Sequence, residues 1–172
     1  MKFEEIEKIL PKEIKKYLDM CSITPQSPDW HPEAPNDIIP HNVYKHIKIV
    51  YNRAFNHDNN DIDMLVSVLF HDLGKVDVTK PSIKKVGGWS AYGHEEVSAK
   101  LVEKHKDWIQ SIGSNWNNVF QIVKEHMRIK NFEEMRKPKQ NELKNNPLFD
   151  KFILFTEFDN MQTLTDYEKF IK

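Results

Sequence analysis

The 172-residue chain has little cysteine and no long apolar runs, and each shortage excludes a class of protein. Its one cysteine, Cys21, rules out an internal disulfide framework and fits a reducing compartment. No apolar run approaches the roughly 20 residues of a membrane span. Residues 1–10 alternate charged and apolar side chains and lack the continuous apolar core of a signal peptide. We therefore expect a soluble, cytoplasmic protein that has no membrane partner.

An excess of charge of either sign is also missing, since 25 basic residues face 26 acidic residues and the formal net charge is −1. This balance argues against a protein held on nucleic acid mainly by its overall field, although it allows a local basic patch. We expect no stable nucleic-acid complex. The length suits a single domain with a substantial apolar core, and the sequence contains no internal repeat.

Apolar residues recur at helical spacing through most of the chain, which predicts an all-α domain. Helices are expected at 3–20 with a break at Pro11, and at 39–55, 61–71, 93–106, 114–129 and 146–159. Asp61 should cap the third of these helices and Gly74 should end it. Thr165 and Glu168 have the spacing of a capping box, which predicts a short final helix.

Three segments depart from the helical pattern. Residues 24–40 are rich in proline and predict an extended loop. Residues 76–92 contain the turn Gly87-Gly88 and predict a short irregular or hairpin insertion near the active site. Residues 130–145 are charged and rich in Asn and Lys, so they should be solvated and mobile. The expected organisation is one domain, 1–172, with N-terminal helices and a loop at 1–38, a metal-binding core at 39–160 and a C-terminal helix at 161–172.

The consecutive pair His71-Asp72 at the end of an apolar stretch is the most informative feature of the chain. An imidazole nitrogen beside a carboxylate oxygen suits a divalent first-row metal ion. Residues of the same types lie at the apolar face or the end of separate predicted helices, namely His46, His94, His126 and Asp159. One such histidine alone would be read as a core residue, but a carboxylate on a buried helix face is costly unless it is paired or binds metal. We expect His46, His71, Asp72 and Asp159 to form a first metal site, and leave open whether His94 and His126 hold a second ion.

This ordered set resembles the HD superfamily of metal-dependent phosphohydrolases. The local amino-acid sequence is most similar to that of the HD domain of bacterial tRNA nucleotidyltransferases, in the stretches 45–47, 70–75, 92–96 and 125–128. The nucleotidyltransferase head of those enzymes has no counterpart, because the chain lacks a Gly-Ser motif followed by paired carboxylates. The resemblance therefore implies a hydrolase module alone, with one or two divalent ions drawn from Mn, Fe, Co, Ni, Mg and Zn. In binuclear relatives, His94 and His126 would hold the second ion and Asp72 would bridge the pair.

The resemblance also implies a phosphatase, 2′-nucleotidase or 2′,3′-cyclic phosphodiesterase acting on a nucleotide or an RNA end. Asp72 would ligate the ion and hold the attacking water. The phosphoryl group would be contacted by Lys75 and Arg128, together with His94 or His126 where these do not bind metal. Two alternatives stay open, a diiron HD-type oxygenase and a nucleotide-binding sensor without turnover. The sequence does not indicate the natural substrate or the oligomeric state.

Overall fold

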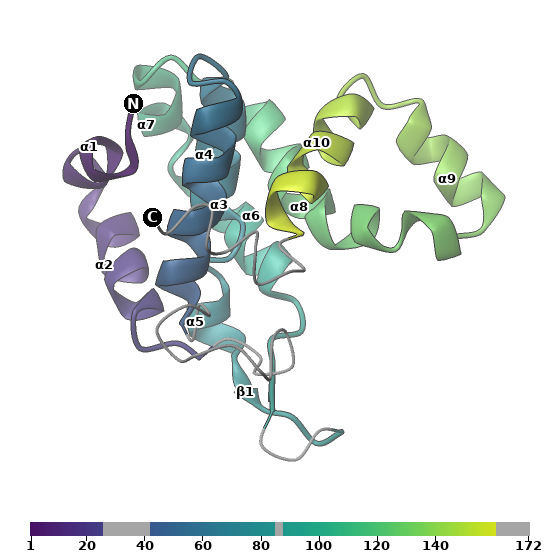
Figure 1. Cartoon of the computed structure of the whole chain (residues 1–172), viewed down its shortest axis with the longest axis horizontal. Coiled ribbons are helices and arrows are strands. Elements are labelled where there is room, and N and C mark those ends of the chain that lie inside the picture. Colours follow the sequence, from purple (N-terminus) through teal and green to yellow (C-terminus); the bar gives the residue numbers. More distant parts are fainter. Residues whose placement is uncertain (26–41, 85–87, 161–172) are drawn as a thin grey trace.

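The structure, a computed structural model, describes residues 1–25, 42–84 and 88–160, and over these ranges the fold is all-α apart from one two-stranded sheet (Figure 1). The elements are α1 (Phe3–Lys8), α2 (Lys12–Cys21), α3 (Val43–His57), α4 (Ile62–Phe70), α5 (Lys75–Val78), β1 (Lys80–Pro81), β2 (Trp89–Ser90), α6 (His94–Lys104), α7 (Lys106–Ser111), α8 (Trp116–Lys130), the 3-10 helix η2 (Phe132–Glu134), α9 (Lys137–Lys144) and α10 (Phe149–Asp159). The predicted fold class is confirmed. Most of the predicted loop at 24–40, the residue Gly87 and the capping box of Thr165 and Glu168 lie outside the described residues.

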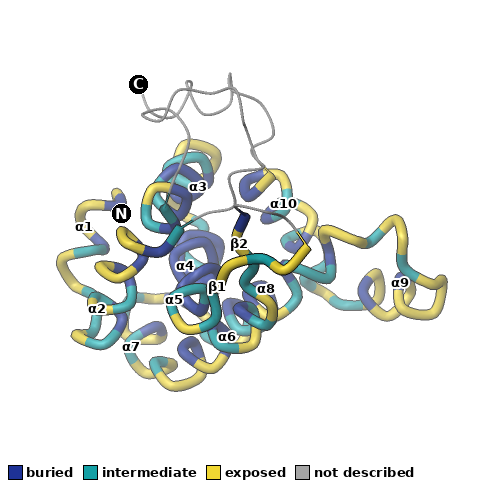
Figure 2. Tube along the Cα trace, turned by 90° about the horizontal axis from the view of Figure 1, so that it is seen from below, coloured by how far each residue is buried: buried dark blue, intermediate teal, exposed yellow. Residues whose placement is uncertain are grey.

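Helix α4 lies at the centre of the bundle, and α3, α6, α8 and α10 all pack against it. Every residue from Met64 to Phe70 is buried, as the dark tube in the middle of Figure 2 shows. A short helix that is apolar on all its faces is stable only when other elements cover it on all sides. Asp61 caps α4 as predicted, because its Oδ1 accepts a hydrogen bond from the Met64 backbone N–H at 3.1 Å.

Helices α8 and α10 complete the core next to α4. Their inward faces carry the buried residues Val119, Ile122, Val123 and Ile129 on α8, and Phe152, Phe155 and Phe158 on α10. The polar residues of the candidate site continue these same faces, since His126 belongs to the buried side of α8 and Asp159 to that of α10. The packing that buries the apolar residues therefore also directs these two polar side chains inward.

The sequence predicted that Gly74 ends helix α4, but the structure differs. Helix α4 finishes at Phe70, and the chain turns before α5. The φ of Gly74 is −62°, an ordinary right-handed value, so the turn needs no left-handed residue. A Cβ added at Gly74 would lie 2.3 Å from the carbonyl oxygen of His94 and 2.8 Å from the Cβ of Val97. The backbone N–H of Gly74 donates to Ser98 Oγ at 2.9 Å. The glycine is thus required by the close approach of α6.

The predicted insertion is an antiparallel hairpin that projects from the helical body (Figure 1). Lys80 lies opposite Ser90, and Pro81 lies opposite Trp89. The hairpin prediction is confirmed, except that residues 76–78 belong to helix α5.

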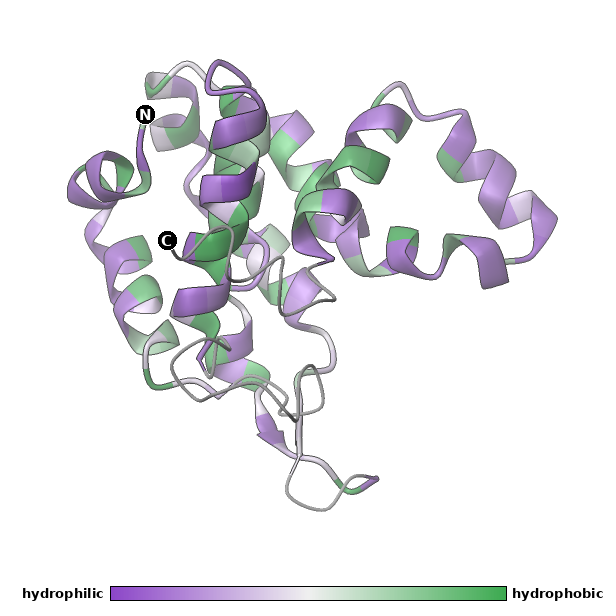
Figure 3. Cartoon of the chain, in the orientation of Figure 1, coloured by the Kyte–Doolittle hydropathy of each residue, from purple (hydrophilic) through white to green (hydrophobic). Residues whose placement is uncertain are grey.

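The prediction of a solvated segment at 130–145 is confirmed, since most of these residues are exposed, but residues 137–144 form helix α9. Pro138 lies in the first turn, where its missing N–H costs nothing, and Gln140 and Leu143 are the residues that α9 buries. Gln140 Nε2 donates to the backbone oxygen of Phe132 at 2.8 Å, which ties α9 to the 3-10 helix η2. Helix α9 forms a mostly hydrophilic arm (Figure 3), because only a narrow strip of it packs against other elements.

Candidate metal centre

His46, His71 and Asp159 come together in the middle of the bundle, from α3, from the turn after α4 and from the last residue of α10. The His46 Nε2 atom lies 2.9 Å from Asp159 Oδ1 and 3.3 Å from His71 Nε2. His71 Nε2 lies 3.3 Å from the same carboxylate oxygen. All three residues are at most 2 % exposed. Residues 113 positions apart in the chain thus direct ligand atoms to one point.

A second cluster consists of Asp72, His94 and His126, from the turn after α4, the start of α6 and the middle of α8. The His94 Nε2 atom lies 3.1 Å from both His126 Nε2 and Asp72 Oδ1. His126 Nε2 lies 3.9 Å from that same oxygen. His94 is only 4 % exposed although it is the first residue of its helix.

Asp72 joins the two clusters through its two carboxylate oxygens. Oδ1 faces His94 and His126, whereas Oδ2 lies 3.3 Å from His71 Nε2 and 3.4 Å from His46 Nε2. A carboxylate with one oxygen toward each of two donor groups has the geometry of a bridging ligand. The six sequence-predicted ligand residues therefore form one continuous site with two candidate ion positions.

Backbone carbonyl groups orient three of the four histidines. Their Nδ1 atoms lie 2.5–2.7 Å from the carbonyl oxygen three residues earlier, in the pairs His71–Val68, His94–Ala91 and His126–Val123. Only an N–H can face an oxygen at this distance, so Nδ1 carries a proton and Nε2 is the nitrogen left to bind metal. The Nε2 lone pairs of His94 and His126 then face each other across 3.1 Å, an arrangement that repels unless a proton or a cation lies between them. The donor set therefore fits a bound cation.

Comparison with known protein families identifies the chain. The family model described as HD domain matches residues 40–159, well over half of the sequence and a range that contains all six clustered residues. The chain belongs to the HD domain family. A search of curated proteins and a search of solved structures each gave no match. HD domains bind divalent metal ions and belong to a metal-dependent hydrolase superfamily, which agrees with the donor set of the two clusters.

The histidines of this HD domain differ in their proton affinity. Burial lowers the pKa of His46 and holds that of His126 well below its usual range. Burial also acts to lower the pKa of His71, but the carboxylates of Asp72 and Asp159 outweigh it and raise that pKa to about 9. In the metal-free protein, both ring nitrogens of His71 therefore carry a proton at neutral pH, and an arriving ion must displace the proton on Nε2.

Both carboxylates of the HD site are ionised and ready to act as ligands. Burial would raise the pKa of Asp72, but the charges of His71 and Lys75 hold it well below its usual range. Burial has the same direction at Asp159, and there Lys130 and His71 hold the pKa well below its usual value. A buried carboxylate in this environment is compensated by the cations around it.

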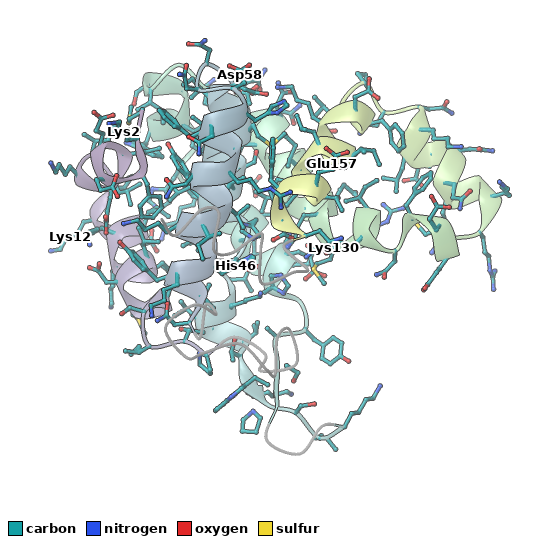
Figure 4. The ribbon with its side chains drawn as sticks, in the orientation of Figure 1. Lys2, Lys12, His46, Asp58, Lys130 and Glu157 are labelled. Carbon is teal, nitrogen blue, oxygen red and sulfur yellow. The ribbon has the colours of Figure 1, made fainter. Side chains whose placement is uncertain are left out.

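Each carboxylate ligand is paired with one lysine. Lys75 Nζ lies 2.8 Å from Asp72 Oδ2, so the structure brings this sequence-predicted residue to the site. Lys130, which the sequence reasoning missed, forms an ion pair with Asp159 Oδ2. Figure 4 shows Lys130 and His46 near the end of α10, where Asp159 lies.

Helix geometry places Lys130 and the sequence-predicted Arg128 on different sides of α8. With about 100° per residue, Lys130 lies about 40° from His126 around α8, whereas Arg128 lies about 200° away. Among the described residues, the partners found for Arg128 are Glu125 at 2.9 Å and Glu142 at 3.8 Å. The structure therefore does not bring Arg128 into the cluster, and its contact with phosphate stays a prediction. A cation four residues after a predicted ligand was the signal that could have identified Lys130.

Phe155 forms an apolar wall of the site. Its ring centroid lies 5.3 Å from that of His71 and 5.8 Å from that of His126. Asp159 shares the buried face of α10 with Phe155, whereas Glu157 is exposed. A wall of this kind keeps water away from the imidazole rings and strengthens the electrostatic interactions between the ligands.

Proposed function

We propose that this HD domain hydrolyses a phosphate ester of a nucleotide or of an RNA end. The observation that carries the proposal is the position of Asp72. Its Oδ1 faces one histidine cluster and its Oδ2 faces the other, and Lys75 Nζ lies 2.8 Å from Oδ2. Two ion positions joined by one carboxylate, next to a cation, can activate a water and neutralise the charge of a phosphoryl group.

The ligand residues divide between the two ion positions. His46, His71 and Asp159 would hold one ion, His94 and His126 the other, and Asp72 would contribute to both. Divalent ions bound there would lower the pKa of a coordinated water and polarise a phosphoryl oxygen. The buried Asp72 carboxylate would accept a hydrogen bond from that water and fix its direction of attack.

Lys75 is placed to act on the substrate itself. Its side chain is 13 % exposed, and its ammonium group lies beside the carboxylate that faces both ion positions. There it would neutralise the charge that develops on the equatorial oxygens of the phosphoryl group. A lysine serves here as a point charge, which does not require a fixed orientation of the phosphate.

Two features support a nucleotide or RNA-end substrate. The local sequence resembles the HD domain of bacterial tRNA nucleotidyltransferases, which favours a 2′-nucleotide, a 2′,3′-cyclic phosphate or a terminal phosphate. Trp89 and Tyr92, just before His94 in the chain, are 39 % and 77 % exposed. Exposed aromatic rings at the edge of a site can stack on a base.

A diiron oxygenase is the second candidate, because two histidine-rich positions sharing Asp72 would also hold a pair of redox-active irons. To distinguish oxygenation from phosphate-ester hydrolysis, the protein is loaded with iron under anaerobic conditions and then exposed to oxygen. New absorption bands and oxygen consumption with an organic substrate would favour the oxygenase.

The test of the proposed function is a substrate screen with purified protein. Metal-free protein is reloaded separately with Mn, Fe, Co, Ni, Mg or Zn and offered 2′-, 3′- and 5′-nucleotides and 2′,3′-cyclic nucleotides. We expect metal-dependent hydrolysis of at least one of these classes, abolished by a chelator and restored by added metal. Full metal occupancy without hydrolysis of any of them would contradict the proposal.

A further inference from the structure

The two oxygens of Asp159 have different partners. Oδ1 lies 2.9 Å from His46 Nε2 and 3.3 Å from His71 Nε2, so it faces the first ion position. Oδ2 forms an ion pair with Lys130. Asp72 differs in this respect, because both of its oxygens face histidines. One carboxylate of the site is therefore arranged to bridge and the other to offer a single oxygen.

The fold holds Lys130 in place for this contact. Lys130 is the last residue of α8 and Asp159 is the last residue of α10, and these two helices pack against each other. A cation is also favoured at the end of a helix by the helix dipole. Its side chain is 27 % exposed, and its ammonium group lies within ion-pair distance of the buried Asp159 carboxylate. The fold therefore brings a cation to Asp159 Oδ2.

We propose that Lys130 is a positioning residue for the first metal position. By occupying Oδ2, its ammonium group leaves only Oδ1 of Asp159 to bind the ion. A carboxylate without such a partner can turn and bind a divalent ion through both oxygens. Binding through one oxygen keeps a coordination position open for water and for a substrate oxygen, which a catalytic site needs. The inference rests on the metal-binding part of the proposed function and not on hydrolysis.

Lys75 provides an internal comparison. Its ammonium group contacts Asp72 Oδ2, the same oxygen that lies 3.3 Å from His71 Nε2. Lys75 thus shares an oxygen with the ion position, whereas Lys130 contacts Asp159 Oδ2 and the two histidines of that position face Oδ1. Removal of Lys130 should change how Asp159 binds the ion, and removal of Lys75 should not.

The test is the visible absorption spectrum of Co²⁺ bound at the first position, together with the number of waters on Mn²⁺ bound there. The second position is disabled in every protein by His94→Ala, which removes one of its ligands. In this background, Lys130→Met should lose one metal-bound water and give an altered Co²⁺ spectrum, because Asp159 then binds through two oxygens. Lys130→Arg restores a charged donor and should recover the parent spectrum.

Lys151→Met, away from the site, serves as the matched control. Lys151 pairs with Asp61 at 2.8 Å, so its loss removes a lysine–aspartate ion pair without touching the metal centre. This control should keep the parent Co²⁺ spectrum. If Lys130→Met does not fold by circular dichroism, Lys130→Gln carries the same test. An unchanged spectrum and water count in the folded neutral variant would overturn the proposal.

The spectrum needs no substrate, so its outcome is independent of the proposed hydrolysis. In the protein with both positions intact, Lys130→Met should also lower any phosphate-ester turnover by about 10- to 100-fold, as expected when a residue that orients a metal ligand is removed.

Discussion

Three histidines of the site are oriented in the same way, because the Nδ1–H group of each donates a hydrogen bond to the carbonyl oxygen three residues earlier. Each bond uses the backbone of the helix or turn on which the histidine lies, so the orientation is set locally. The fourth, His46, directs Nε2 to Asp159 Oδ1 at 2.9 Å. Their identity as ligands could be inferred from the sequence, because these polar residues interrupt apolar faces. The carbonyl partners could not, because they depend on the rotamer that the surrounding packing selects.

Metal binding should release a proton from His71. Its pKa is about 9 in the folded protein against an ordinary value of 6.5, so in the metal-free state its charge adds stability below pH 6.5. That stability is lost as the pH rises through about 9, whereas an ion-bound His71 has no proton to lose. The rise in Tm caused by added metal should therefore grow between pH 6.5 and 9.

Calorimetric titration with Mn²⁺ at pH 7.5, in two buffers of different ionisation enthalpy, measures the released proton directly. We expect about one proton for the His71 position. Equal heats in the two buffers would show that His71 is already neutral in the metal-free protein.

At the scale of elements, the close approach of the turn after α4 to α6 fixes the distance between Asp72 and His94. Gly74 permits this approach, since a Cβ there would lie 2.3 Å from the His94 carbonyl oxygen, a backbone atom that cannot move alone. The sequence predicted this glycine as the end of a helix and not as a packing requirement, because the neighbouring helix lies 20 residues further along the chain.

Gly74→Ala should lower the free energy of unfolding by about 1–3 kcal/mol through overpacking. It should also weaken metal binding at the second position, because α6 and His94 must move. Gly113→Ala is the matched control: its φ of +85° makes alanine unfavourable by about 1–2 kcal/mol, but nothing lies within 4 Å of the added Cβ. Urea unfolding and metal titration of both variants make the comparison, and unaltered metal binding in Gly74→Ala would show that His94 is not held by this contact.

The hairpin of β1 and β2 should influence substrate choice more than metal binding. Ala91 must be kept in any test, because its carbonyl oxygen orients His94. Replacement of residues 82–88 by a short Gly-Ser link should leave metal content unchanged and alter the relative turnover of different nucleotides. A loss of bound metal in this variant, measured by elemental analysis, would contradict the prediction.

At the scale of the whole molecule, the site exists only when segments from α3 to α10 are assembled. Its six ligand residues extend from His46 to Asp159, and α4 at the centre aligns the helices that carry them. No helix in the part of the chain that the structure describes is long and apolar enough to cross a membrane. Helical periodicity predicted this assembly because most of its helices have a wide apolar face.

Two features escaped the sequence reasoning because their cause is tertiary. Helix α9 buries little more than Gln140 and Leu143, so its sequence lacks the apolar stripe that marks a helix. Lys130 is one of many lysines in the sequence, and only the packing of α8 against α10 brings it to Asp159.

The central claim, a shared-carboxylate metal centre that hydrolyses phosphate esters, depends most directly on Asp72. Asp72→Ala removes the ligand common to both ion positions, whereas Lys75→Ala removes only a cation beside it. The Lys75 variant should keep its metal and lose about 10²–10³ in turnover, the usual effect of removing one group that stabilises developing charge. Circular dichroism verifies that each variant folds. If Asp72→Ala does not fold, Asp72→Asn is used in its place.

The deciding measurement is phosphate release and bound metal per chain in Asp72→Ala, beside the wild type and Lys75→Ala, on the best substrate of the nucleotide screen. We predict that folded Asp72→Ala loses bound metal and releases no phosphate above the metal-free background. Wild-type phosphate release by folded Asp72→Ala would contradict the assignment of this centre as a metal-dependent phosphohydrolase.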